Sequence, residues 1–203
     1  MGKIDFKKEL PYYKARVGKP EILTIPAMNY LQIDGNGNPN NSIEFQQAVE
    51  ALYTVAYMLK FMVKKQDGTD YGVAPLEALW WADDMNDFII AKKDNWKWTA
   101  MIMQPEYVTD TLYKDAIKAA AGKKDLPSFN KMRWESMDEG LCVQVIYTGP
   151  YADEGPTIQS LHKFAKDNAF HLSGKHHEIY LNDQRKTAPD KLKTIIRQPV
   201  IKA

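Results

Sequence analysis

A glutamate stands in the middle of a strand-like segment near the end of the chain, in the stretch HHEIYLN that begins at His176. Strand alternation places Glu178, Tyr180 and His176 on one face and Ile179 and Leu181 on the other. We expect the isoleucine and the leucine to pack on a helix, which leaves the carboxylate and the phenol together on the opposite face. A glutamate is costly to bury without partners, so a carboxylate enclosed there indicates a functional site.

The plainer interpretation of Glu178 is an exposed strand residue, or one that forms a surface ion pair with Arg185 or Lys175. If aromatic rings enclose it instead, we expect burial to raise its pKa moderately, while a hydrogen bond from Tyr180 would oppose that rise. Such a carboxylate would still be ionised at neutral pH and could act as a general base.

Aromatic and acidic side chains elsewhere could line a pocket around such a carboxylate. The chain has five tryptophans, eleven tyrosines and seven phenylalanines, more flat apolar side chains than a core of this size needs. For each tryptophan, packing in the core is an equally good interpretation. The pocket candidates outside the glutamate strand are Glu77, Trp80, Trp81, Tyr147 and Tyr151.

Other kinds of site find little support in the sequence. The four histidines lack the spacing of a zinc site, and the single cysteine, Cys142, is interpreted best as a buried and inert thiol. No phosphate-binding glycine pattern and no serine-hydrolase turn occurs. We therefore expect no metal and no cofactor. The net charge of +1, from 27 basic and 26 acidic residues, gives no reason to expect nucleic acid or a membrane surface as a partner.

The expected localisation rests on the lack of a membrane-spanning run and of a signal-peptide pattern in the sequence. No apolar run approaches the ~20 residues that span a bilayer. The first 20 residues mix charges with two prolines and show no signal-peptide pattern, so they predict an N-terminal tail on a cytoplasmic protein.

The order of predicted elements repeats along the chain. A strand over residues 21–35 precedes an amphipathic helix from Ile43 to about Lys65, which Asn41 would cap in a capping box with Glu44. The remaining predicted elements are strands at 71–82 and 96–105, a helix at 108–121, a short strand at 132–136, a strand at 141–151, a helix at 157–170, and strands at 176–183 and 192–200.

The two halves also share sequence at matching places. MIMQP ends the fourth element of the first half, and IIRQP ends the fourth element of the second. Glu77 takes the place of Glu178 in the third element of its half. These matches indicate an internal duplication.

We therefore expect an α+β fold built of two βαββ repeats, at about 21–105 and 141–200, joined by a linker that contains a helix. Together the repeats would form a single domain over residues 21–203. They would share one curved antiparallel sheet, with helices on one face and a central ligand cleft on the other. Because the duplication already supplies a two-fold pairing, we expect a monomer.

Six stretches cover nearly all of the chain past residue 20 and carry a resemblance to a known family. They are YLQIDGNGNP, AVEALYTVAYMLK, YGVAPLEALWW, MIMQPEYVT, YTGPYADEGPTIQSLHKF and HHEIYLNDQRKTAPDKLKTIIRQPV. Together they resemble the GyrI-like small-molecule-binding family. The resemblance implies two βαββ repeats around an aromatic-lined pocket. It places the pocket glutamate at Glu178, followed by Tyr180, with Trp80 and Trp81 contributed by PLEALWW.

The resemblance also implies three alternative functions. The first, which we favour, is hydrolysis of the strained cyclopropane of planar, hydrophobic DNA-alkylating natural products, a detoxification. Glu178 would activate water, and Tyr180 or Tyr147 would donate a hydrogen bond to the carbonyl that takes up charge. The second is sequestration of hydrophobic or cationic drugs without chemistry, with Tyr151 and His176 among the contacts.

The third alternative is a protein-interaction module, as in gyrase-inhibiting relatives, which would depend on an outer surface patch. Family members that regulate genes carry a DNA-binding helix-turn-helix. The first 20 residues are too short for one, so we do not expect direct gene regulation.

Overall fold

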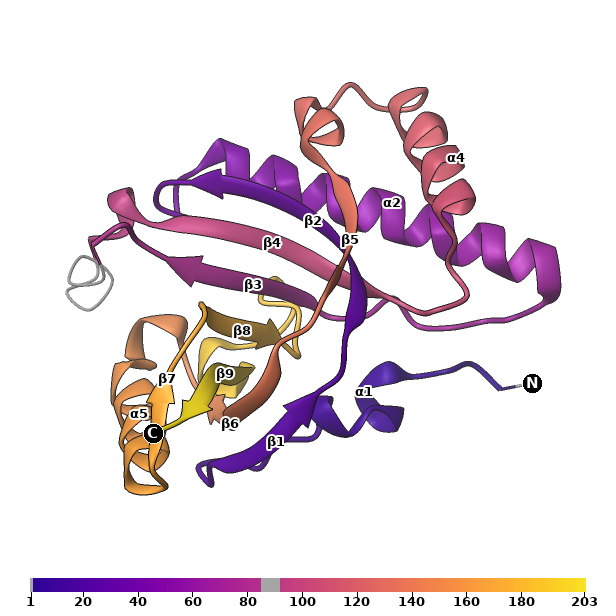
Figure 1. Cartoon of the computed structure of the whole chain (residues 1–203). Coiled ribbons are helices and arrows are strands. Elements are labelled where there is room, and N and C mark those ends of the chain that lie inside the picture. Colours follow the sequence, from indigo (N-terminus) through magenta and orange to yellow (C-terminus); the bar gives the residue numbers. More distant parts are fainter. Residues whose placement is uncertain (1, 85–91) are drawn as a thin grey trace. The chain divides into compact units, whose positions relative to one another are not determined.

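The computed structural model describes residues 2–84 and 92–203 of the chain, which fold as two compact units (Figure 1). Of the described residues, unit 1 comprises 2–6, 28–84 and 92–137, and unit 2 comprises 7–27 and 138–203. Within these described ranges no helix combines the length and the apolarity that crossing a membrane requires.

Unit 1 is an antiparallel sheet in the strand order β5-β2-β4-β3, with α2 packed on β2 and β4 and with α4 packed on α2 (Figure 1). Its elements are β2 (Met28–Asn36), α2 (Ile43–Asp67), β3 (Leu76–Trp81), the 3-10 turn η2 (Lys93–Asn95), β4 (Lys97–Gln104), α4 (Asp110–Ala121), η3 (Pro127–Lys131) and β5 (Arg133–Met137).

The helix α2 is capped at both ends. Ser42 rather than the expected Asn41 is its N-cap, and the Ser42 hydroxyl accepts a hydrogen bond of 3.1 Å from the main-chain N–H of Phe45. Gly68 ends the helix in the left-handed region, at φ 80°, where a glycine carries no steric penalty.

An aromatic cluster fills the core at one end of unit 1. The ring of Phe45 on α2 lies 5.6 Å from Trp80 on β3 and 5.0 Å from Trp98 on β4, between ring centroids. Gly35 on β2 is the cross-strand partner of Trp98, and a Cβ atom there would come within 2.2 Å of the indole. The glycine therefore lets the indole lie against the neighbouring strand.

Unit 2 also has antiparallel strands, in the order β1-β6-β9-β8, and β7 pairs with the last residues of β9. The helix α5 packs on β6 and β9. Its elements are β1 (Glu21–Ile25), β6 (Gly140–Thr148), η4 (Tyr151–Asp153), α5 (Gly155–Asp167), β7 (Phe170–Leu172), β8 (His176–Tyr180), η5 (Pro189–Lys191) and β9 (Lys193–Lys202). The short α1 (Phe6–Glu9) and η1 (Pro11–Tyr13) precede β1.

The expected α+β fold and its duplication are confirmed by the topology of the two units. In unit 1 the βαββ run is β2-α2-β3-β4, and the strands lie in the order β2-β4-β3. In unit 2 the corresponding run is β6-α5-β8-β9, and the strands lie in the order β6-β9-β8. Each sheet also carries one additional strand on the outer side of its first strand, β5 in unit 1 and β1 in unit 2.

The beginning of the chain differs from the expectation. The single strand expected over residues 21–35 is two strands, β1 and β2, which belong to different units. Pro26 lies between them and has no N–H to continue a ladder. Residues 1–20, expected to be a tail, contribute buried side chains at Phe6, Tyr13 and Ala15.

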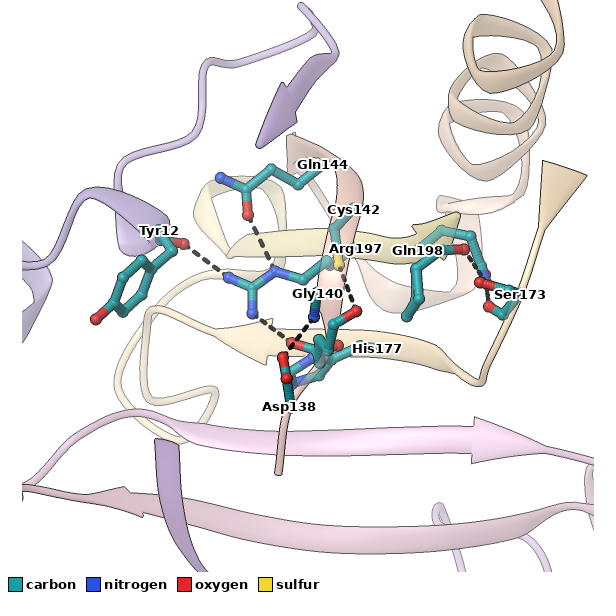
Figure 2. A network of polar contacts seen from close by, with 11 residues as sticks. Tyr12, Asp138, Gly140, Cys142, Gln144, Ser173, His177, Arg197 and Gln198 are labelled. Carbon is teal, nitrogen blue, oxygen red and sulfur yellow. Dashed lines mark hydrogen bonds and ion pairs between the residues drawn. The ribbon is translucent and has the colours of Figure 1, made fainter. Parts of the chain in front are cut away.

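A buried ionic network holds unit 2 together on the sheet face away from α5 (Figure 2). Arg197 on β9 is fully buried, and its Nη1 donates to Glu139 Oε2 over 2.8 Å. Its Nε donates to Gln144 Oε1 over 3.1 Å, and its Nη2 donates to the main-chain carbonyl of Tyr12 over 2.8 Å. The other carboxylate oxygen of Glu139 lies 2.8 Å from His177 Nδ1 on β8. The network thus joins three strands to the N-terminal segment.

Neighbouring side chains keep the buried Glu139 carboxyl ionised. Burial raises the pKa of its carboxyl, but His177 and then Arg197 outweigh burial and hold the pKa at about 2. Nearby, burial raises the pKa of the Cys142 thiol to about 12, in line with the inert cysteine expected from the sequence.

We predict that Arg197→Met destabilises the protein by about 3–5 kcal/mol, because it leaves the Glu139 carboxylate buried without its guanidinium partner. Urea unfolding at neutral pH measures the change. The matched control is Arg185→Met, which removes a largely exposed guanidinium bonded to Asp183 and should cost at most about 1 kcal/mol. Equal losses in the two variants would show that the buried network contributes nothing particular.

Acid should act through the same network. Because the folded pKa of Glu139 is lower than the unfolded value, its stabilisation is fully present above about pH 4.3 and is lost as the pH falls toward 2. In Glu139→Gln, the free energy of unfolding should no longer fall because of this carboxyl between about pH 4.3 and pH 2. Unfolding measured at a series of pH values checks this.

Candidate functional site

The strand register puts Glu178 beneath α5, on the face opposite to the expected one. Glu178 is the cross-strand partner of Ile196, which is in turn the partner of Val145. Ile196 and Val145 pack with Leu161 and Ala165 of α5 in the buried core of unit 2. Because cross-strand partners share a face, the carboxylate lies on the helix-covered side.

Ile179 and Leu181 were the residues expected to pack on the helix, and for Ile179 that expectation is wrong. It is the partner of Ile195 and shares the other face with His177 and Arg197. One face of β8 is buried and the other is at least half-buried, so alternation alone could not tell which apolar side chains meet the helix.

Three side chains surround the Glu178 carboxylate. The Tyr180 hydroxyl donates to Oε2 over 2.7 Å, and His176 Nε2 lies 3.2 Å from Oε1. The third partner is the carboxyl of Glu154, which hydrogen-bonds to Glu178. Glu154 is the N-cap residue of α5, is 4% exposed, and makes no capping hydrogen bond with its side chain.

A hydrogen bond between two carboxyl groups requires a proton, because an ionised carboxylate can only accept. The contact with Glu154 lowers the pKa of Glu178, as a donor does. We therefore predict that Glu154 carries the shared proton.

The pKa of Glu178 is lower than its ordinary value, which corrects the expectation of a moderate rise. Burial raises it, but the hydrogen bond and charge of His176, followed by hydrogen bonds from Tyr180 and Glu154, outweigh burial. On α5, burial and the proximity of His176 lower the pKa of His162. The ionised carboxylate is thus stabilised by donors, with no lysine or arginine in contact among the described residues.

Two further tyrosines lie beside this cluster. The rings of Tyr151 and Tyr180 meet edge to face with 5.4 Å between centroids. Tyr147 faces the same side of the sheet, but its hydroxyl donates to the Pro150 carbonyl over 2.9 Å and lies where a Cβ on Gly149 would stand. Four of the expected site residues, Glu178, Tyr180, His176 and Tyr151, are therefore together, and Tyr147 is near with its hydroxyl hydrogen engaged.

The other expected site residues belong to unit 1. Trp80 is buried in the aromatic core, where it contacts Phe45 and lies 5.7 Å from Trp96, between ring centroids. Trp81 borders a hollow of about 440 Å³ together with polar side chains that include Lys97. Glu77 is fully buried on β3. A cavity shared by these residues and the tyrosines stays a prediction, as does ligand binding by Glu77, Trp80 and Trp81.

The proposed match between Glu77 and Glu178 is wrong by one residue of register. Gln104 and Gln198 do correspond, since each faces the helices and donates its amide to main-chain carbonyls. Two residues before Gln104 stands Ile102, whose partner on β3 is Leu76. Two residues before Gln198 stands Ile196, whose partner is Glu178. The counterpart of Glu178 is therefore Leu76, and Glu77 points to the opposite face.

Glu154 is the site residue that the sequence analysis missed. The stretch ADEGP did indicate where Glu154 lies. Pro156 marks the start of a helix, so the acidic Glu154 stands at the N-terminus of that helix. That position is typical of helix capping, so nothing in the sequence indicated a partner on β8.

Comparisons with known proteins agree with this architecture. The sequence profile of the GyrI-like small molecule binding domain matches residues 18–201. No curated protein matched the chain.

Solved structures resemble the whole chain. An uncharacterized conserved protein from Listeria innocua is 38% identical with a TM-score of 0.87, over 98% of this chain and 100% of that one. A structure described as a hydrolase from Listeria innocua is 38% identical over the same shares, with a TM-score of 0.84. The C-terminal domain of EcmrR is 15% identical with a TM-score of 0.56, over 91% of this chain and 98% of that one, which is a likeness of fold alone.

We predict that the parent protein at neutral pH shows the infrared carbonyl band of a protonated carboxylic acid, and that Glu154→Gln removes it. Glu178→Gln should leave the Glu154 proton in place. Glu135→Gln, at an exposed carboxylate paired with Arg133, is the control and should change no such band. Difference spectra that are alike for Glu154→Gln and Glu135→Gln would contradict a protonated Glu154.

Proposed function

The chain belongs to the GyrI-like small-molecule-binding family, and from this premise we propose that it is a hydrolase that opens the cyclopropane of planar, hydrophobic alkylating compounds. The coarser part, binding of small molecules, comes with membership of the family. The finer part is supported above all by the contact between the Glu178 and Glu154 carboxyl groups, which in our proposal share a single proton.

The pair supplies a base and an acid at one place. In the proposal, Glu178 is the ionised partner and takes a proton from water, and Glu154 carries the shared proton and gives it up. Two like groups with different proton occupancy are a common arrangement in hydrolytic sites, because their environments assign the two roles. The 38% identical relative described as a hydrolase favours chemistry over binding alone.

The reaction requires a cyclopropane conjugated to a carbonyl in a flat ring system. A water oxygen forms a bond to the methylene carbon while Glu178 accepts a water proton. The strained carbon–carbon bond breaks, and its electron pair moves into the ring to make a phenolate oxygen. That oxygen takes the proton of Glu154, so the product is the substrate plus one water.

The pair then resets itself. After turnover Glu178 holds the proton and Glu154 is ionised, and transfer along their hydrogen bond restores the starting state. The cycle neither consumes nor releases a proton, so a buried site needs no proton pathway to bulk water.

The tyrosines have supporting roles in this proposal. The Tyr180 hydroxyl donates to Glu178, so it holds the base and stabilises its charge rather than facing the substrate carbonyl. Tyr151 meets Tyr180 at its ring edge and offers an aromatic wall to a flat ligand. Tyr147 directs its hydroxyl hydrogen to a main-chain carbonyl, so Glu154 replaces it as the acid that we favour.

A second candidate is sequestration of planar cations without chemistry. The Glu178 carboxylate could attract a planar cation, and the rings of Tyr151 and Tyr180 beside it could stack on that cation. Because the pKa of Glu178 is low, this charge and the affinity for a cation should persist from neutral pH down to about pH 5. Binding measured by calorimetry without any product would favour this candidate.

We predict that the purified protein converts a cyclopropane-bearing alkylator to a product heavier by one water, which mass spectrometry in heavy-oxygen water detects. Glu178→Gln and Glu154→Gln should each lose about 10²-fold or more in turnover while the protein stays folded. Each substitution keeps the shape of the side chain and removes one proton-transfer group.

The exposed Glu135→Gln is the matched control and should keep the parent rate. If Glu178→Gln turns over the substrate as fast as the parent, Glu178 is not the base. If the parent forms no product but binds flat cations, sequestration is the better account.

A further inference from the structure

A buried threonine hydroxyl lies on the same face as the carboxyl pair. Thr194 on β9 is fully buried, and its cross-strand partners are Tyr147 on β6 and Tyr180 on β8. These three side chains form the row next to the row that contains Glu178. Thr194 is therefore diagonal to Glu178, with about 7–8 Å between the Cα atoms.

The hydroxyl of Thr194 makes no hydrogen bond within the part of the chain that the structure describes. The hydroxyls on either side are directed elsewhere, Tyr147 to the Pro150 carbonyl and Tyr180 to Glu178. A buried hydroxyl without a partner costs folding free energy, and a valine of the same shape would avoid that cost. The polar group at this position indicates a partner that arrives from outside the chain.

Unit 1 shows that the fold does not need a hydroxyl there. The position four residues before Gln198 is Thr194, and the position four residues before Gln104 is Ala100. The strand partners of Ala100 are Ile33 and Ala78, where Thr194 has Tyr147 and Tyr180. The same place in the duplicated sheet is thus wholly apolar in one unit and hydroxyl-bearing in the other.

We propose that Thr194 holds the water that attacks the substrate, an inference that rests on the proposed function. Glu178 accepts hydrogen bonds from His176 and Tyr180 and, in the proposed function, from Glu154, which leaves one of its lone-pair directions for a water. That water donates one hydrogen to Glu178 and the other to Thr194 Oγ1. Both hydrogens are then fixed, and the oxygen lone pair is free to attack the methylene carbon.

Thr194 is a positioning residue in this proposal, since the proton goes to Glu178 and no bond to the threonine forms or breaks. Removing the Thr194 hydroxyl should lower kcat, because kcat depends on the orientation of the water, and should leave KM nearly unchanged. If Thr194 served packing alone, its substitution would instead change the stability of the protein without a selective loss of kcat.

The test compares Thr194→Val and Thr194→Ser with the parent enzyme on a cyclopropane-bearing alkylator. We expect Thr194→Val to lose 10-fold or more in kcat with KM within about 2-fold and with an unchanged or higher Tm. Thr194→Ser keeps the hydroxyl and should recover most of kcat. A valine variant with the parent kcat would overturn the proposal, and so would a serine variant as slow as the valine one.

A crystal structure of the free protein separates this proposal from the proposed function. We expect an ordered water within hydrogen-bonding distance of both Thr194 Oγ1 and the Glu178 carboxylate, absent in Thr194→Val. If the parent has no hydrolytic activity but this water is present, the hydrolase proposal fails and water binding by Thr194 stands. If the water is absent from the parent, the role of Thr194 is overturned whatever the activity. Should the valine variant not fold, Thr194→Ala, which copies Ala100 of unit 1, takes its place.

Discussion

The register of β8 against β9 is the constraint on which unit 2 depends. With His177 opposite Arg197 and Glu178 opposite Ile196, each ionisable side chain of β8 reaches the partners that can hold it. A slip of one residue would exchange the two faces of the strand. Glu178 would then approach the Glu139–Arg197 pair, and His177 would meet the apolar core beneath α5. The buried ionic network on one face therefore fixes the position of the carboxyl pair on the other.

The two faces bury carboxylates in different ways. Glu139 is compensated by the Arg197 guanidinium and by His177, which together hold its pKa at about 2. Glu178 is compensated by Tyr180, His176 and Glu154, and its pKa is also lower than the ordinary value. The two faces thus differ in that a guanidinium contacts Glu139 and none among the described residues contacts Glu178.

Much of the fold could be predicted from the sequence, because helix and strand periods and the repeated QP ending are local signals. Alternation grouped His176, Glu178 and Tyr180 correctly, since it needs only the period of a strand. It could not assign the helix-covered face, because both faces of β8 are at least half-buried. Glu154 was missed for a related reason: its partner lies 24 positions later in the chain, and only the packing of α5 on the sheet brings the two carboxyls together.

The duplication provides an internal reference for which polar groups the fold itself requires. The row Val145–Ile196–Glu178 of unit 2 corresponds to Leu31–Ile102–Leu76 of unit 1, so the same sheet position accepts a leucine. Glutamine is kept at the strand end in both units, where it donates to main-chain carbonyls, as a structural role would require. Glu178 differs from Leu76 at a site where an apolar side chain satisfies the fold. Burying a carboxylate there requires three partners that a leucine would not need, so the requirements of the fold do not explain the glutamate.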